Sequence, residues 1–307
     1  MFHVKQSEKA TPNDVFGVDT PLAREIADLS ARRRVLEGVS LDFTGDTRIL
    51  TVSNQKGGVG KTTTAVNIAA ALASFGAKVL VIDLDPQGNA STALGVAHDA
   101  QTNSIYDVLI NDVALEEIVQ PSPESDNLFC APSTIHLAGA EIELVSQVAR
   151  EHRLRRALEQ YLSDHPTDVV IIDCPPSLGL LTINAFTAAS EVFIPIQCEY
   201  YALEGLSQLL GSIQMIQKHL NPALHLSTIL LTMYDGRTRL AQQVADEVRN
   251  HFPEQTLQTV IPRSVRVSEA PSFGQTVIAY DGASAGAVAY REAAVEIASQ
   301  ATQSKEN

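Results

Sequence analysis

Short apolar runs rich in valine and isoleucine recur through the chain and alternate with stretches of helical periodicity. The helical spacing extends over residues 62–75, 135–162, 203–220 and 239–252. The apolar runs occupy residues 49–54, 79–83, 127–132, 169–175, 191–197, 227–234 and 259–262. Continuous apolar runs are typical of strands buried on both faces, with crossover helices covering a parallel sheet. The pattern therefore predicts an α/β fold with one doubly wound, mostly parallel sheet flanked by helices.

The two ends of the chain depart from this pattern. Residues 1–47 contain several prolines and glycines and are too poor in apolar residues for a core strand, so we expect a largely irregular extension. A short helix is predicted at 21–36, where Leu22, Ile26 and Leu29 recur at helical spacing. Residues 48–302 form the predicted domain, and 303–307 a frayed tail.

The composition limits the kind of protein. With 45% hydrophobic and 19% charged residues, the 307-residue chain is expected to form a globule. The three cysteines, Cys130, Cys174 and Cys198, are far apart in sequence, which favours buried thiols over a redox pair. The N-terminus lacks a secretory apolar segment, so we expect a cytoplasmic location. The net charge of −14 argues at first against nucleic acid or an anionic membrane as a partner.

Residues 49–75, ILTVSNQKGGVGKTTTAVNIAAALASF, combine a strand, a glycine-rich turn and an alanine-rich helix. Such a turn directs backbone N–H groups at phosphate, and the helix adds its positive dipole end. The motif places Lys61 on the β and γ phosphates, the Thr62 hydroxyl on Mg²⁺, and Thr63 on the α phosphate. The sequence therefore predicts an ATP site with Mg²⁺, and the loop residues expected to line it are Gly57, Gly58, Val59, Gly60, Lys61, Thr62 and Thr63.

The loop departs from the usual G-x-x-x-x-G-K-[ST] pattern at its entrance, where Gln55 replaces the first glycine and Lys56 follows. Because Lys61 already serves the phosphates from its own loop, Lys56 is suited to neutralise phosphate charge from another direction, most naturally that of a partner subunit. KGGVGKTT (56–63) resembles the deviant Walker A motif of the ParA/MinD class of P-loop ATPases. The resemblance implies that Lys56 contacts ATP across a sandwich dimer, as an arginine finger does in trans.

Acidic residues follow two other predicted strands, at the sheet edge where such folds bind ligands. In VVIIDCPPS (169–177), Asp173 matches a Walker B acid that would hold Mg²⁺ through Thr62 and water. In VIDLDPQGN (81–89), Asp83 and Asp85 point to the same side of an extended chain. The resemblance implies that Asp85 orients the attacking water and acts with the two loop lysines in catalysis, while Asp83 lies nearer the metal.

Across about residues 48–300, further segments resemble the chromosomal ParA (Soj) branch of the class. They include LAGAEIELV (137–145), QCEYYALEGLSQL (197–209), TMYDGRT (232–238) and IPRSVRVSEAP (261–271). In that family Mg-ATP closes a homodimer that binds double-stranded DNA without sequence preference, and the ParB centromere-binding protein stimulates slow hydrolysis. The resemblance therefore implies a nucleoid-associated ATPase that segregates chromosome origins, with a polar scaffold protein as a further candidate partner. It also suggests an adenine-side wall made by Met233, Pro262 and Ser264.

The distribution of basic residues changes the charge argument. Arg237 and Arg266 match positions where the family has DNA-contacting arginines, which bind phosphate without reading sequence. Lys218, Arg239 and Arg263 are candidate helpers. Residues 211–266 hold six basic and four acidic side chains, a balance of +2 that leaves −16 for the rest of the chain. Net acidity therefore does not exclude DNA, but it predicts weak, salt-dependent binding that needs a dimer.

Three other interpretations stay open. A MinD-like membrane ATPase requires a basic amphipathic C-terminal helix, whereas residues 286–300 set Arg291 against Glu292 and Glu296, so we expect no direct membrane binding. An iron–sulfur carrier with the same loop requires thiolates gathered at the dimer interface, which the solitary cysteines do not favour. In the third interpretation ATP is only a switch for docking a polar or replication partner, with little hydrolysis.

Overall fold

The computed structural model describes residues 20–43, 45–199 and 202–303 and divides the chain into two compact units, 1–39 and 40–307. In the first unit, helix α2 (Pro21–Glu37) confirms the helix predicted at 21–36. The Thr20 hydroxyl accepts a hydrogen bond from the Ala23 amide, and a proline opens the first turn, where its missing N–H costs nothing. The division precedes residue 48, the predicted start of the domain. The predicted tail spans 303–307, of which Gln303 is the last residue of α13 (Ala285–Gln303) and residues 304–307 lie outside the described residues.

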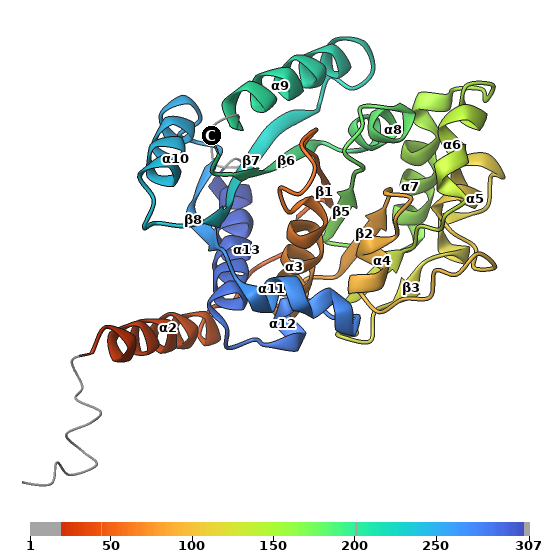
Figure 1. Ribbon diagram of the computed structural model, residues 1–307. Helices are drawn as coiled ribbons and strands as arrows, with labels where there is room; N and C mark the ends of the chain where they lie inside the picture. Colours follow the sequence, from red (N-terminus) through yellow and green to blue (C-terminus); the bar gives the residue numbers. More distant parts are fainter. Residues whose placement is uncertain (1–19, 44, 200–201, 304–307) are drawn as a thin grey trace, which may run out of the picture. The chain divides into compact units, whose positions relative to one another are not determined.

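The second unit is built on a sheet whose strand order is β3-β4-β2-β5-β1-β6-β7-β8 among the described residues. All neighbouring strands are parallel except β3 and β4. The prediction of a doubly wound, mostly parallel sheet is therefore confirmed (Figure 1). The strands are β1 (Arg48–Val52), β2 (Val79–Asp83), β3 (Gln120–Pro121), β4 (Leu128–Ala131), β5 (Val169–Asp173), β6 (Glu191–Gln197), β7 (His225–Tyr234) and β8 (Thr256–Pro262).

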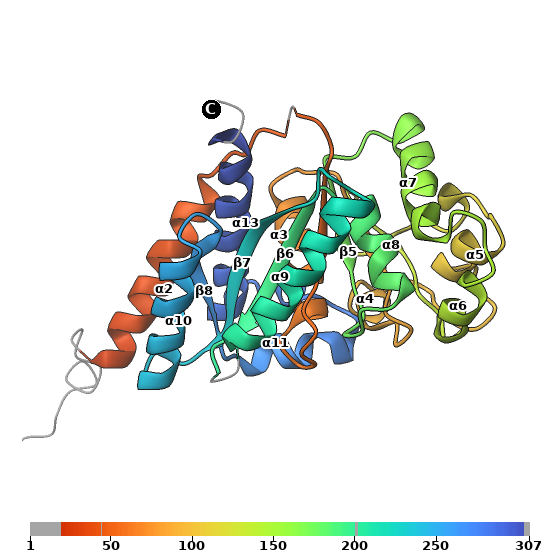
Figure 2. The ribbon, with the colours of Figure 1, turned by 90° about the horizontal axis from the view of Figure 1, so that it is seen from above.

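Helices cover both faces of this sheet (Figures 1 and 2). In β2, Leu80 and Ile82 pack into one hydrophobic core, while Val79 and Val81 pack into a second core on the opposite face. This explains the continuous apolar runs, because alternate residues are buried on different sides. The helices are α3 (Lys61–Ser74), α4 (Asn89–Ala93), α5 (Ile105–Ile110), α6 (Leu137–Leu144), α7 (Arg153–Asp164), α8 (Leu180–Ala188), α9 (Ala202–His219), α10 (Arg239–His251), α11 (Val265–Glu269), α12 (Val277–Tyr280) and α13 (Ala285–Gln303), with single turns η1 (Leu115–Glu117), η2 (Arg150–His152) and η3 (Ala270–Phe273).

Two features differ from the sequence pattern. The helical periodicity at 135–162 is not one helix, because the chain leaves α6 after Leu144 and Ala149 adopts a left-handed conformation with φ of 50° before α7 begins. The two-residue strand β3 contains no apolar run, so the sequence pattern did not predict it. Its Pro121 is tolerated because β3 is an edge strand.

Strand register fixes the position of the candidate site. Val52 at the end of β1 pairs with Asp173 at the end of β5, and Asp83 at the end of β2 also pairs with Asp173. The carboxyl ends of these three central strands therefore meet at one edge of the sheet, where parallel α/β folds bind ligands.

Candidate nucleotide site

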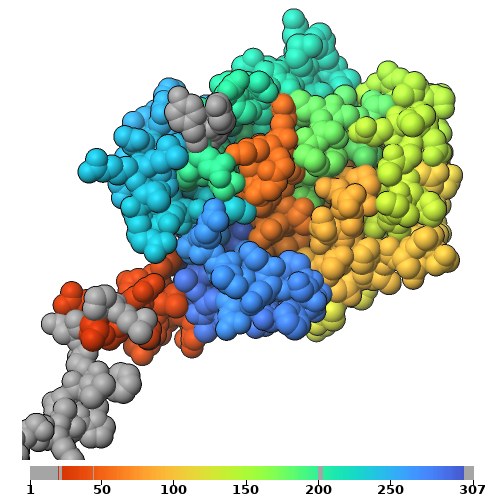
Figure 3. Space-filling model, viewed as in Figure 1, coloured from red at the N-terminus to blue at the C-terminus, as the bar shows by residue number. Residues whose placement is uncertain are grey.

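The phosphate loop connects β1 to α3 at this edge. Gly58 and Gly60 have φ values of 75° and 87°, a region that costs glycine little, and Gly60 caps α3. A Cβ atom at Gly57 or Gly58 would meet nothing within 4 Å, so the loop is open on that side. The space-filling view shows the orange surface around this loop exposed on the same face as the blue C-terminal segment (Figure 3). The backbone geometry is therefore that of a phosphate-binding loop at a helix N-terminus.

Lys61 lies inside the loop rather than on its surface. Its side chain is buried, and its ammonium donates a hydrogen bond to the Lys56 carbonyl at 3.3 Å. Burial lowers the pKa of Lys61, while the negative charges of Asp173 and Asp85 oppose that shift. An ammonium that is partly desolvated and faces two carboxylates is well placed for a polyanion, because its attraction to phosphate is weakly screened.

Asp173 is buried without a hydrogen-bond partner of good geometry for either carboxylate oxygen among the described residues. Burial and the neighbouring Asp83 raise the pKa of Asp173 well above its usual range, although the nearby Thr62 hydroxyl lowers it. Buried carboxylate oxygens of this kind fit a cation, since a metal would supply the missing partner. Thr62 and Asp173 are therefore the residues that fit Mg²⁺, which prefers a few protein oxygens completed by phosphate and water.

Asp83 is held differently from Asp173. Its carboxylate accepts hydrogen bonds from the Ser91 amide at 2.8 Å, the Ser91 hydroxyl at 2.7 Å and the Asp85 amide at 3.1 Å. Burial nevertheless raises the pKa of Asp83 to about 6. These hydrogen bonds connect β2 to α4, and they occupy the Asp83 carboxylate with donors of the protein itself. The predicted role of Asp83 near the metal stays a prediction.

Asp85 lies where β2 turns away from the sheet edge. Its carboxylate accepts a hydrogen bond from the Gln87 amide at 3.0 Å, and Gly88 completes the turn with φ of 64°. Asp85 is partly exposed, and its charge acts on Lys61. The structure thus brings the predicted water-orienting carboxylate to the same edge as Lys61 and Asp173.

Lys56 projects from the entrance of the loop. Its ammonium donates to the Glu199 carboxylate at 2.6 Å, and the exposed fractions of the two side chains are 41% and 47%. The Lys56 amide donates to the Asn54 side chain at 3.0 Å, and Asn54 in turn donates to the Pro195 carbonyl at 2.9 Å. Sequence reasoning missed Glu199 and Asn54, because the contacts join β1 and β6, which are far apart in the chain.

The ends of β7 and β8 border the loop on one side. Thr232 donates to the Val59 carbonyl at 2.8 Å, and the Met233 side chain lies 3.9 Å from where a Cβ of Gly60 would be. Met233 has φ of 50°, a strained conformation for a non-glycine residue and a common sign of a functional site. Pro262 pairs with Tyr234, and Ser264 caps α11. The three predicted adenine-side residues therefore lie on adjacent strand ends, and their contact with adenine stays a prediction.

The arginines predicted to contact DNA are in the loops and helix starts that follow β7 and β8. Since Tyr234 pairs with Pro262, the segments carrying Arg237 and Arg266 leave the sheet side by side. Arg239 begins α10, and Arg263 donates its amide to the Tyr234 carbonyl at 3.4 Å. Lys218 is the exception, because it lies in the last turn of α9 at the opposite edge of the sheet, where β7 begins.

Comparisons with known proteins agree with this geometry. The family model described as AAA domain (AAA_31) matches residues 47–226, more than half of the chain. The sporulation initiation inhibitor protein Soj of Bacillus subtilis is 53% identical over 251 residues, 82% of this chain and 98% of that protein. The chromosome partitioning protein ParA of Myxococcus xanthus is 53% identical over 243 residues, 79% of this chain and 85% of that protein.

Among solved structures, cobyrinic acid a,c-diamide synthase from Mycobacterium smegmatis with bound ADP and magnesium superposes with a TM-score of 0.70. It is 42% identical and covers 81% of this chain and 93% of its own. The fold is shared by proteins of different names, and the Soj and ParA relatives are the more similar to this chain in sequence. The chain therefore belongs to the Soj/ParA family of chromosome-partitioning ATPases.

Proposed function

We propose that this chain binds Mg-ATP, closes into a homodimer around two nucleotides and in that state binds double-stranded DNA without sequence preference. ParB-stimulated hydrolysis then releases the DNA, and the cycle segregates chromosome origins on the nucleoid. The observation that carries this proposal is that two lysines of one loop have different positions and therefore different roles. Lys61 is buried within the loop, whereas Lys56 projects from its entrance.

The position of Lys56 supports its action on a partner's nucleotide. Within one protomer its ammonium faces Glu199 rather than the interior of the loop. Because an exposed ion pair contributes little stability, exchange of Glu199 for phosphate costs little. A phosphate supplied by a second protomer at this edge is therefore a competitive partner for Lys56.

The hydrolytic step follows from the arrangement of charges at the strand ends. Thr62 and Asp173 would hold Mg²⁺, which when bound neutralises charge on the transferred phosphoryl group. Lys61 stabilises that group from within the loop, and Asp85 orients the attacking water. Phosphoryl transfer requires positioning and charge stabilisation rather than a strong base. A partly exposed carboxylate such as that of Asp85 is therefore sufficient to position the water.

Two substitutions in the loop test the proposal. In Lys61→Ala we expect ATP affinity to fall at least about tenfold, because a charged hydrogen-bond donor to phosphate is lost. In Lys56→Ala we expect ATP affinity close to wild type but no ATP-dependent dimer by light scattering. An ATP-dependent dimer of Lys56→Ala would contradict the action of Lys56 in trans.

A further inference from the structure

Arg237 is held by a carboxylate of its own chain. Its Nε donates to Asp235 Oδ1 at 2.9 Å and its Nη2 donates to Oδ2 at 3.0 Å, a two-pronged contact. The Arg237 side chain is 91% exposed, whereas the Asp235 side chain is 31% exposed and lies in the turn after β7. The fork that suits a carboxylate also suits a phosphate, because both present two oxygens in one plane.

The Asp235 carboxylate is influenced by the positive charges of two arginines, Arg237 and Arg263. The hydrogen bond from Arg237 lowers the pKa of Asp235 to about 2, and the charge of Arg263 contributes to the shift. Asp235 therefore stays ionised at any working pH. Its negative charge therefore interacts with two of the arginines predicted to contact DNA, Arg237 and Arg263.

Arg266 has a similar arrangement on the neighbouring segment. Its Nη1 lies 3.3 Å from the Glu269 carboxylate and its Nε lies 3.4 Å from the Asp281 carboxylate. Both predicted DNA-contacting arginines are thus neutralised by acids of the same protomer. Two separate segments, the turn after β7 and helix α11, share this feature, which argues against an accident of one side-chain conformation.

We propose that Asp235 is an intramolecular competitor of DNA phosphate for Arg237, and that Glu269 and Asp281 act in the same way on Arg266. The inference rests on the proposed DNA binding, and it identifies these carboxylates as the groups that limit the affinity for DNA. For an arginine to bind phosphate, its guanidinium must first leave its own carboxylate. The competition weakens each contact, so that a single protomer holds DNA poorly and two protomers joined by ATP are needed for retention.

The size of the effect follows from the exposure of the pair. Because an exposed ion pair is weak, removal of its acidic partner changes DNA affinity by at most about fivefold per arginine. A dimer presents two copies of Arg237, so the gain on removing Asp235 is up to about 25-fold for the ATP-bound dimer. The gain for a monomer is limited to about fivefold.

Asp235→Asn in the full-length protein tests the competition. Asparagine keeps an oxygen that can accept the Arg237 amide, which donates to Asp235 at 3.1 Å, so the turn is preserved. Asp246→Asn is the matched control, because it removes the same charge from an exposed position on α10. Retention of a nonspecific DNA duplex is measured with ATP and with ADP over a range of salt concentrations.

We expect Asp235→Asn to bind DNA more than fivefold tighter than Asp246→Asn in the presence of ATP. In an Arg237→Gln background most of the difference between the two substitutions should disappear, because the guanidinium for which Asp235 and phosphate compete is absent. Equal effects in the wild-type background, or weaker binding by Asp235→Asn, would overturn the competition and make Asp235 a support for Arg237. If the unmodified protein shows no ATP-dependent retention, the proposed function itself fails.

Discussion

Buried ionisable side chains distinguish the nucleotide site from the rest of the sheet edge. Lys61, Asp83 and Asp173 are all shielded from solvent. Burial lowers the pKa of Lys61 and raises the pKa of both aspartates, so in each case it favours the neutral form. A fold that buries three such groups together loses stability unless a ligand compensates. Mg-ATP supplies a cation for the carboxylates and an anion for the lysine. This explains why the ionisable groups whose burial lowers stability are gathered at the nucleotide site.

Asp85 offers a test of the hydrolytic step alone. In Asp85→Ala we expect ATP binding and dimerisation to persist, because among the described residues the Asp85 carboxylate accepts a hydrogen bond from its own turn, at the Gln87 amide. Hydrolysis should fall about 10²-fold, the usual contribution of a group that handles the attacking water. Single-turnover hydrolysis of bound ATP measures this rate directly.

Gln87→Ala is a useful control for that experiment, since Gln87 contributes only its backbone amide to the bond with Asp85. We expect near wild-type hydrolysis from it. Wild-type hydrolysis by Asp85→Ala would remove the water-orienting role from this residue.

The glycine-rich turn between β1 and α3 was predictable from the sequence, because a phosphate loop is encoded by consecutive residues. The sequence did not predict the residues that restrain the site. Glu199 lies 143 positions from Lys56, and Ser91 reaches Asp83 only because α4 folds back on β2. Such pairs depend on strand order, which no local spacing reveals.

At the scale of elements, α12 connects distant parts of the second unit. Glu124, in the loop before β4, accepts hydrogen bonds from the Thr276 amide and hydroxyl at 2.5 and 2.7 Å. The next amide, that of Val277, donates at 2.8 Å to Asn67 of α3, whose side chain donates to the Thr63 carbonyl at 2.7 Å. The start of α12 is thus fixed between an edge loop and the phosphate-loop helix.

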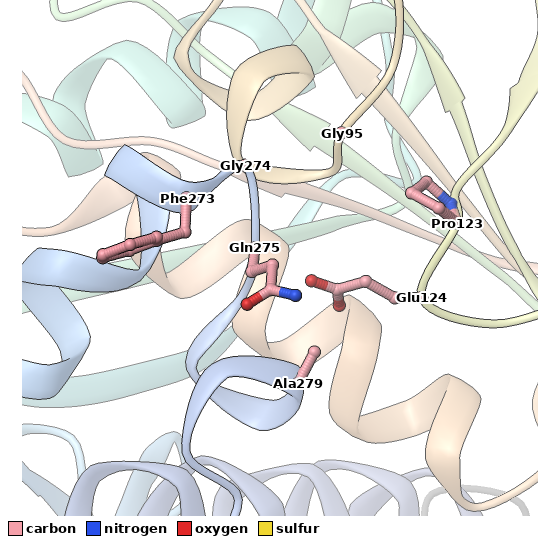
Figure 4. A pocket seen from close by; sticks show the side chains of 7 residues that line it. All are labelled: Gly95, Pro123, Glu124, Phe273, Gly274, Gln275 and Ala279. Carbon is pink, nitrogen blue, oxygen red and sulfur yellow. The ribbon is translucent and has the colours of Figure 1, made fainter.

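Glu124 also lines a hollow between this loop and the C-terminal segment. Figure 4 shows its carboxylate and the Gln275 amide turned toward one another, with Ala279 beneath and Phe273 at the other end. Partial burial raises the pKa of Glu124 above 4.5, although the bonds from Thr276 oppose the shift. The folded protein therefore binds this proton more tightly than the unfolded chain does.

A pH dependence of stability follows. Below about pH 4.5 the neutral carboxyl contributes its full stability, and this contribution is lost as pH rises through the raised pKa of the folded state. We expect the free energy of unfolding of wild type minus that of Glu124→Gln to decrease as pH rises above about 4.5. Urea unfolding of both proteins between pH 4.5 and 7.5 measures the difference, and a rise over that range would show that the bonds with Thr276 outweigh burial.

The elements themselves were predictable where burial is extreme. Runs such as residues 79–83 and 169–173 are buried along their whole length, so their hydrophobicity marks them as strands. The break between α6 and α7 was not predictable, because it depends on the positive φ of Ala149, a residue that favours helix. The short edge strand β3 arises only from pairing with β4.

For the whole molecule, the distribution of charge matters more than the total of −14. Arg237, Arg239, Arg263 and Arg266 converge beyond the ends of β7 and β8, although they are separated along the chain by α10 and β8. Lys218, predicted to help them, lies at the opposite edge. Within residues 20–43, 45–199 and 202–303, each helix is too short or too polar to span a lipid bilayer.

A surface of a few partly neutralised arginines on an acidic protein should bind DNA weakly when present in one copy. Dimerisation doubles the number of phosphate contacts without any new residue. DNA binding should therefore depend on ATP and fall steeply with salt, because each phosphate contact releases a counterion. Arg237→Glu and Arg266→Glu should lose retention while keeping the DNA-independent ATPase activity.

The decisive test of an ATP-controlled DNA-binding dimer is DNA retention measured with ATP, with ADP and without nucleotide, each in the presence and absence of ParB. We expect retention with ATP alone, its loss in Lys61→Ala, and its reversal when ParB is added. Equal retention in all three nucleotide states, or none in any of them at low salt, would contradict an ATP-controlled DNA-binding dimer.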